Sequence, residues 1–411
     1  MPISEKPHTW TPFIELGRLV ERQWIQHHND VEEFPNIATA ALHEFQVLDG
    51  IELNLLFGEL LAERHVQPRH EFSDLAIRLY ETPEFYVELL VWLEGRAAIH
   101  EHPFSGAFKV IGGGSVHGHY EFQTDVSICS RLHIGKPLLI RAEVLKPGDV
   151  RKILPGSALL HGLFHFEQPS FTLVLRTKQE KRYLPQLAVD LPHFAADYEL
   201  RFDPEVEFCV KAINTAYAIE PKKSEAMLLE SVSQLDLARA YSVCTNLFFW
   251  EYVTSQSVSN QLEERLQGLS KLVSDVVSVR KKLQLLQRYR VGACEKEDLF
   301  YIGLLSVIHS SRHVREILER HGGVEEGLAR LAKVLVKSQV CRLGDDLYSE
   351  DQRIELLRSF LKHEDRKEFL ERVPRTLEVP GSEKAKRYFR SYFENQTKDP
   401  FVRSFSASAA D

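Results

Sequence analysis

The spacing of hydrophobic residues divides the chain into a helical start, a strand-rich middle and a helical second half. Near the start, apolar residues recur at three- and four-residue steps, which is the period of an amphipathic helix. The pattern predicts helix over about residues 11–65, interrupted at Pro35, with separate segments over 38–48 and 51–61. These helices are expected to cover one face of the segment that follows.

From about residue 81 the pattern changes to short apolar runs separated by Gly- and Pro-containing turns. The run 85–93 is rich in aromatic and β-branched residues and is typical of a buried strand. The other predicted strands are 108–111, 116–122, 138–145, 150–154 and 171–176. Short strands at this spacing favour an antiparallel β-sandwich or barrel over a sheet of βαβ units.

After about residue 222 long helical patterns return, rich in Leu, Glu, Arg and Lys. The predicted helices cover 224–245, 257–290, 296–321, 324–341 and 351–372, and a loose tail is expected from Ser404 onward. The fold class is therefore α+β. The expected domains are a helical N-terminal cap (1–80), a β-barrel (81–200) and a helical C-terminal domain (201–411).

Composition, charge and cysteine spacing argue against several classes of function. The 411 residues carry a net charge of −8 with both signs mixed along the chain, so no basic footprint for nucleic acid is expected. No apolar run reaches the ~18 residues of a membrane helix, and the N-terminus does not resemble a signal peptide. The five cysteines lie far apart without a CxxC pair, which argues against a disulfide framework and favours the cytoplasm.

The candidate chemistry starts at His100 and His102, two residues apart just after an apolar run. In a strand, residues i and i+2 point to the same face, so both imidazoles are expected to enter one interior. This is a common way to present two nitrogen ligands to a metal. A purely structural pair is the alternative.

A third histidine, His161, follows about sixty residues later, after two Pro-Gly turns with a strand between them. Together with the glycine five residues before His100, this order resembles the two motifs of the cupin superfamily over about residues 85–177. The resemblance implies a small antiparallel jelly-roll barrel that holds a metal between the two motif strands.

Most cupins carry a ligand Glu shortly after the first motif, whereas this chain has Ser105-Gly106-Ala107. Within the superfamily it is the thiol dioxygenases, cysteine dioxygenase among them, that use three histidines, and the local sequence around His100 is similar to theirs. The resemblance implies that His100, His102 and His161 bind Fe(II). Ni, Zn or Cu would also fit such ligands by affinity alone.

Three positions depart from the cysteine dioxygenases. Val174 and Arg176 stand where that family has His and Tyr, and Ala107 stands where it has the cysteine that cross-links to the Tyr. The substrate therefore need not be cysteine. Arg176 and Val174 are two residues apart, so their side chains share one face of the predicted strand. Arg176 is therefore a candidate to bind a substrate carboxylate through two hydrogen bonds. The resemblance offers Arg78 for the same role, and Arg96 as a weaker candidate.

Other histidines leave alternatives open. His165 rivals His161 as third ligand, but lining the site or facing solvent fits it better. His117 and His119 form a second HxH with Glu121, either as a separate site or on the outer face, and His117 is also a candidate catalytic acid, base or substrate contact. His309 and His313 at i and i+4 are expected to share a helix face without a metal, since the glutamate of HExxH is missing.

These observations predict an oxidoreductase, a metal-dependent cupin-type dioxygenase acting on a small thiol-, amine- or carboxylate-bearing substrate. Its partners would be that substrate and dioxygen, with no nucleic acid or membrane involved. The helical C-terminal domain is a further candidate surface for a homodimer or for a protein partner. Two rival functions remain: a non-redox isomerase or lyase that uses the metal as a Lewis acid, and a non-catalytic scaffold or sensor.

Overall fold

The structure is a computed structural model. It describes residues 9–46, 53–62, 67, 73–93, 98–248, 250, 256–292, 294–341, 348–362, 366–376 and 383–405. The weaker arginine candidate, Arg96, and the end of the tail lie outside the described residues. Among the described residues, no helix combines the length and the apolar character needed to cross a lipid bilayer.

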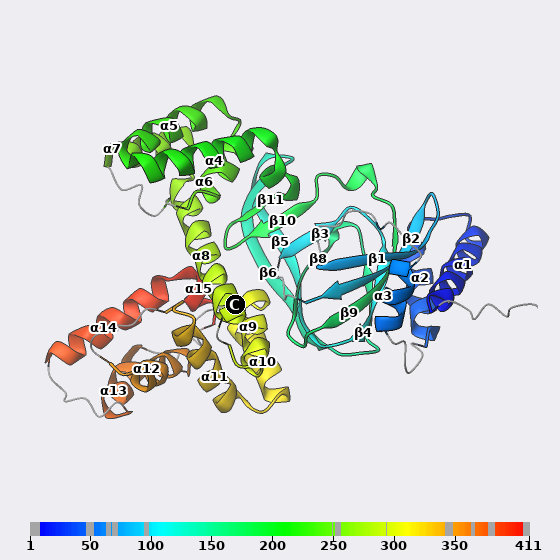
Figure 1. The fold of residues 1–411 in the computed structure, drawn as a ribbon. Coiled ribbons are helices and arrows are strands. Elements are labelled where there is room, and N and C mark those ends of the chain that lie inside the picture. Colours follow the sequence, from blue (N-terminus) through cyan, green and yellow to red (C-terminus); the bar gives the residue numbers. More distant parts are fainter. Residues whose placement is uncertain are drawn as a thin grey trace, which may run out of the picture. The chain divides into compact units, whose positions relative to one another are not determined.

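The strands form two sheets (Figure 1). One sheet has the order β1-β2-β9-β4-β7, and the other closes into a barrel of order β10-β11-β6-β5-β8-β3. The strand bounds are β1 (Leu75–Glu81), β2 (Phe85–Trp92), β3 (Ile99–His102), β4 (Gly106–Gly112), β5 (Ser115–Cys129), β6 (Leu132–Leu145), β7 (Val150–Ile153), β8 (Gly156–His165), β9 (Ser170–Thr177), β10 (Leu187–Asp190) and β11 (Phe194–Asp197).

Three helices precede the strands: α1 (Thr11–Gln26), α2 (Phe34–Glu44) and α3 (Leu53–Ala62). The later helices are α4 (Pro204–Ile219), α5 (Pro221–Gln234), α6 (Leu237–Thr245), α7 (Gln256–Arg265), α8 (Ser270–Gly292), α9 (Asp298–Val307), α10 (Ser311–Arg320), α11 (Val324–Lys337), α12 (Glu350–Lys362), α13 (Arg366–Thr376), α14 (Glu383–Lys398) and α15 (Pro400–Arg403). The predicted α+β fold is confirmed: an antiparallel barrel with a helical N-terminal part and a mostly helical C-terminal part.

Several predicted element bounds are wrong, for local reasons. Pro35 does not interrupt a helix but lies in the first turn of α2, where its missing N–H costs nothing. The helix predicted over 257–290 is two helices, α7 and α8, because Gln267 and Gly268 adopt positive φ between them. The long helix predicted over 296–321 is likewise α9 and α10, with Ser310 capping the second.

Contacts divide the chain into two compact units. The first consists of Met1–Arg96, Glu101–His117 and Val144–Leu184, and the second of Ala97–His100, Gly118–Glu143 and Pro185–Asp411. The division passes within β3, β5 and β6. The predicted three-domain bounds stay a prediction.

In the first unit, the five-stranded sheet has two different faces. One face packs against α1 and α2, and there Leu173, Leu175 and Ala107 join a cluster with helix residues such as Phe13 and Phe34. The opposite face carries Val174, Phe108 and Phe104 in a second cluster. Alternation along β9 therefore sends every second side chain away from the helices and toward the cluster that adjoins the histidines.

Candidate metal centre

Strand β3 presents the first two candidate ligands. It pairs with β10, where Ala188 lies opposite His100, and this pairing fixes the pleat of the short strand. His100 and His102 are both buried, whereas Glu101 between them is partly exposed. The predicted i, i+2 presentation is therefore the one that the structure has.

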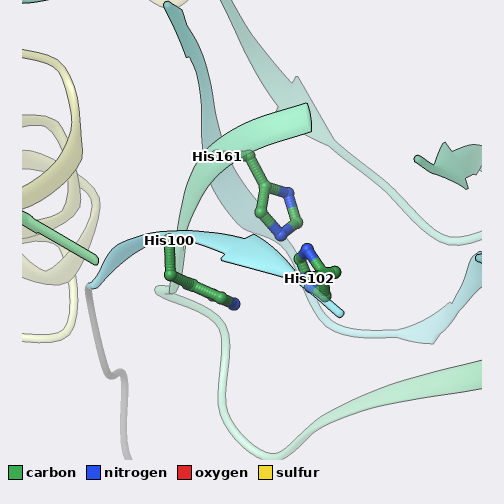
Figure 2. A group of neighbouring side chains, drawn as sticks. All are labelled: His100, His102 and His161. Atoms are coloured by element: carbon green, nitrogen blue, oxygen red, sulfur yellow. The ribbon is translucent and has the colours of Figure 1, made fainter. Parts of the chain in front are cut away.

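Strand β8 supplies the third candidate. His161 is buried, and its ring centroid lies 4.8 Å from that of His102. One ligand atom from each of His100, His102 and His161 lies within 4.8 Å of the other two, and Figure 2 shows the three side chains together, two from β3 and one from β8. The residues that sequence reasoning selected as metal ligands are thus neighbours.

Hydrogen bonds define which nitrogen each ring can offer. His100 Nδ1 lies 3.1 Å from the carbonyl oxygen of Ala98, which can only accept, so Nδ1 carries the proton and Nε2 keeps its lone pair. Burial lowers the pKa of His100 to about 4. At neutral pH this imidazole is therefore uncharged, which is the form that binds a metal.

His161 is oriented in a similar way by a neighbouring histidine. Its Nδ1 lies 2.8 Å from His117 Nε2, which makes the Nε2 atom of His161 the candidate ligand atom. Three buried imidazoles whose nitrogen atoms lie close together suit a divalent transition metal, because imidazole is a ligand that these ions accept readily. The side chains present therefore fit a divalent metal.

The second HxH lies near a carboxylate, but not the one that the sequence predicts. His117 is fully buried and His119 is partly exposed, with His119 Nε2 3.6 Å from Glu143 Oε1. Ligand atoms of His117, His119 and Glu143 also lie within 4.8 Å of one another. The predicted third member, Glu121, is exposed and is absent from this group of described residues.

His165 neither faces solvent, as one expectation had it, nor joins either histidine group. Its Nδ1 lies 2.8 Å from Ser115 Oγ and 2.9 Å from Ser170 Oγ, and its ring stacks on Trp92 at 4.5 Å. Burial lowers its pKa to about 3. This is a neutral core histidine whose polar atoms are satisfied by hydroxyl groups.

The two candidate arginines lie together around a buried carboxylate that the sequence analysis did not single out. Arg78 Nη2 lies 3.0 Å from Glu88 Oε1, and Arg176 Nε lies 3.8 Å from Glu88 Oε2. Glu88 is only 3% exposed. Both guanidinium groups lie over the ring of Tyr86, at 4.0 and 4.8 Å. The signal that could have found this cluster is the lone charged residue inside the apolar run of β2.

Arg176 approaches the histidines through Phe104. Its guanidinium carbon lies 4.0 Å from the centroid of the Phe104 ring, and the same ring contacts His102 edge-on at 4.8 Å. Within the described part of the chain, the buried Arg176 Nε has no hydrogen-bond partner, since Glu88 lies beyond hydrogen-bond distance. Of the two candidate arginines, Arg176 is thus the one a single ring away from His102.

The positions that depart from the cysteine dioxygenases lie on opposite faces of the sheet. Ala107 belongs to the cluster that packs against the helices, whereas Val174 belongs to the inner cluster with Phe104. Arg176 lies opposite Gly106 in the strand pairing, not opposite Ala107. A side chain at Ala107 would therefore point away from the one at Arg176.

The pair His309 and His313 does not share a helix face, contrary to expectation. Helix α10 begins at Ser311, so His309 precedes it and lies against the rings of Phe401 and Phe405. His313 is buried, with its Nδ1 2.9 Å from Ser310 Oγ. The break before α10 separates the two rings, and the pair belongs to neither candidate metal group found among the described residues.

Comparison with known proteins gives a likeness in fold only. No family model and no curated protein matches the chain. Among solved structures, it is similar to a cupin superfamily protein from Desulfitobacterium hafniense DCB-2, with 14% identity over 33% of this chain and 94% of the other, at a TM-score of 0.19. It is also similar to KdgF from Halomonas sp., with 15% identity over 30% of this chain and 95% of the other, at a TM-score of 0.20.

A third similar structure is hydroquinone 1,2-dioxygenase from Sphingomonas sp. TTNP3, with 12% identity over 26% of this chain and 68% of the other, at a TM-score of 0.20. At these TM-scores and identities, no residue role and no activity of the similar structures is assigned to this chain. The barrel is assigned from the strand pairing of this chain, and the candidate metal centre is assigned from its own histidines.

Proposed function

We propose that this chain is a metal-dependent oxygenase of the cupin type, acting in the cytoplasm. Iron(II) would be held by His100, His102 and His161, and the substrate would be a small molecule with a thiol, amine or carboxylate group. The observation that carries the proposal is the convergence of three buried imidazoles from two strands. When bound, iron(II) supplies the redox chemistry that makes dioxygen reactive.

The charge of the ligand set supports an anionic substrate. Three neutral imidazoles leave the charge of a divalent ion uncompensated, unlike a set that contains a carboxylate. The nearby cluster adds to this field, because Arg78, Arg176 and Lys178 outnumber Glu81 and Glu88 by one charge. A substrate thiolate or carboxylate would supply the missing negative charge.

Arg176 is the side chain best suited to orient such a substrate. Arg78 is paired directly with two carboxylates, Glu81 and Glu88, whereas the contact of Arg176 with Glu88 is longer, at 3.8 Å. A guanidinium group binds a carboxylate through two parallel hydrogen bonds, which fixes the position of the bound molecule. The rings of Phe104 and Phe108 exclude water around the imidazoles and strengthen these charged contacts.

The test is metal content and oxygen consumption of protein purified without oxygen. The wild type, loaded with iron(II), is expected to retain the ion and to consume dioxygen with one class in a panel of thiol carboxylates, thiol amines and amino acids. The His161→Ala variant is expected to lose most of both. The matched control is His165→Gln, because His165 is equally buried on the same strand but lies outside the three-histidine group.

Two results would contradict the proposal. Full metal content in the His161→Ala variant would remove His161 from the ligand set. Turnover of a substrate without dioxygen, supported equally by zinc and iron, would identify a Lewis-acid isomerase or lyase and exclude an oxygenase.

A further inference from the structure

His117 is fully buried and lies against the proposed metal ligand His161. Its Nε2 atom is 2.8 Å from His161 Nδ1, and the two rings are nearly perpendicular, at 80° with centroids 5.0 Å apart. Phe108 lies beside both rings, at 6.1 and 6.5 Å. In such apolar surroundings water competes little for the shared hydrogen bond, which is therefore strong and directional.

The proton in this contact can be assigned from the role of His161. If His161 offers Nε2 to a metal, its proton must be on Nδ1, and Nδ1–H then donates to His117 Nε2. His117 must accept at Nε2 and so carry its own proton on Nδ1. A side chain at this position that cannot accept would remove the acceptor that this contact provides to the Nδ1–H of His161.

We propose that His117 is a positioning residue of the metal centre, which holds the ring and the tautomer of His161 for coordination. This inference rests on the proposed function, because it assumes that His161 binds the metal. It gives His117 a different role from the catalytic acid or base that the sequence suggested, since the Nε2 atom that would transfer a proton to substrate is engaged by His161. Partners of this kind typically change metal affinity by about 10- to 100-fold.

The strand pair β5–β8 contains its own comparison. His165 on β8 contacts Ser115 on β5, as His161 on β8 contacts His117 on β5, and all four side chains are buried. A change at His165 therefore tests what the loss of a buried histidine between these two strands does to the protein. A change at His117 tests the loss of such a buried histidine and, in addition, the effect on the proposed metal ligand His161.

The experiment is a titration of the metal-free full-length chain with Co(II), followed by the visible absorption of the bound ion. His117→Leu removes the acceptor and is expected to weaken Co(II) binding about 10- to 100-fold. His117→Gln places an amide oxygen near the Nε2 position and is expected to bind Co(II) within about threefold of the wild type, since the amide oxygen accepts the same proton. His165→Leu is expected to leave Co(II) affinity unchanged, although both leucine variants lose a buried polar contact.

The outcomes separate the two proposals. If the wild type binds no Co(II), the proposed function fails together with the inference. If the wild type binds Co(II) and His117→Leu binds it equally well, the metal centre stands and the positioning role is refuted. If the wild type binds two ions and His119→Gln removes one, His117 is itself a ligand of the group with His119 and Glu143, and the positioning role is again refuted. Equal weakening by His117→Leu and His117→Gln would also refute it, because the accepting atom would then not matter.

Discussion

A buried lysine joins the N-terminal helices to the sheet, and its removal gives the most informative test of the packing in the first unit. Lys109 on β4 is 8% exposed, and its Nζ atom donates to the carbonyl oxygens of Leu42, at 2.9 Å, and Phe45, at 2.6 Å. Both oxygens lie at the C-terminal end of α2, where carbonyl groups lack partners within the helix. The ammonium group thus acts as a cap supplied by the sheet.

The substitution Lys109→Met keeps the length of the apolar stem and removes the charged donor. Each hydrogen bond to a charged group is worth about 1.5–3 kcal/mol net, and a cation at a helix C-terminus adds about 0.3–1 kcal/mol. Burial opposes this gain, because it lowers the pKa of Lys109 and so disfavours the ammonium form. We expect the free energy of unfolding to fall by about 2–4 kcal/mol.

The assay is urea denaturation followed by tryptophan fluorescence, which reports on this region because Trp10 and Trp24 belong to the cluster between the helices and the sheet. The matched control is Lys152→Met. Lys152 also reaches α2 from the sheet, with its Nζ 2.6 Å from Asn36 Oδ1, but it is exposed and is expected to contribute less than about 1 kcal/mol. Equal losses in the two variants would refute the capping role of Lys109.

Three further results are expected from single substitutions. Burial lowers the pKa of His165 from 6.5 to about 3. The unfolded chain therefore takes up a proton below pH 6.5 that the folded chain does not, and stability falls by about 1.4 kcal/mol per pH unit from 6.5 toward 3. His165→Gln should remove that part of the slope of unfolding free energy between pH 6.5 and 5, and an unchanged slope would contradict the assignment. Gly106→Ala should prevent normal folding, as judged by circular dichroism, because its Cβ would lie 2.1 Å from the Leu175 carbonyl oxygen. Gly58→Ala, with no atom within 4 Å, should stabilise by about 0.5–1 kcal/mol.

The histidines of the candidate metal centre could be selected from sequence because their geometry is mostly local. His100 and His102 need only the two-residue period of one strand. His161 comes from a distant strand, and only the resemblance to a known pair of motifs linked it to the first two. The environment of His165 could not be predicted, because the hydroxyl groups of Ser115 and Ser170 reach it from two other strands.

The strands of the β5–β6 hairpin were underestimated for a related reason. Residues 123–129 and 132–137 lie outside the predicted strands, because no apolar run marks them, yet β5 and β6 extend through them. Glu143 lies in a predicted strand, but its proximity to His119 on β5 could not be inferred from the sequence. In the helical half, capping residues were overlooked. Asp203 followed by Pro204 starts α4, a helix absent from the predicted set.

The two arginines beside Glu88 differ in how closely they contact its carboxylate. A buried carboxylate without a cation would be costly, so one arginine is required for the stability of Glu88 alone. Arg78 meets that requirement with direct hydrogen bonds at 3.0 and 3.3 Å, whereas Arg176 Nε remains at 3.8 Å. The direct hydrogen bonds of Glu88 are thus made by Arg78, and Arg176 is the more distant of the two cations. Because Arg176 also contacts Phe104, the ring beside His102, it is the arginine that we propose for binding an anionic substrate.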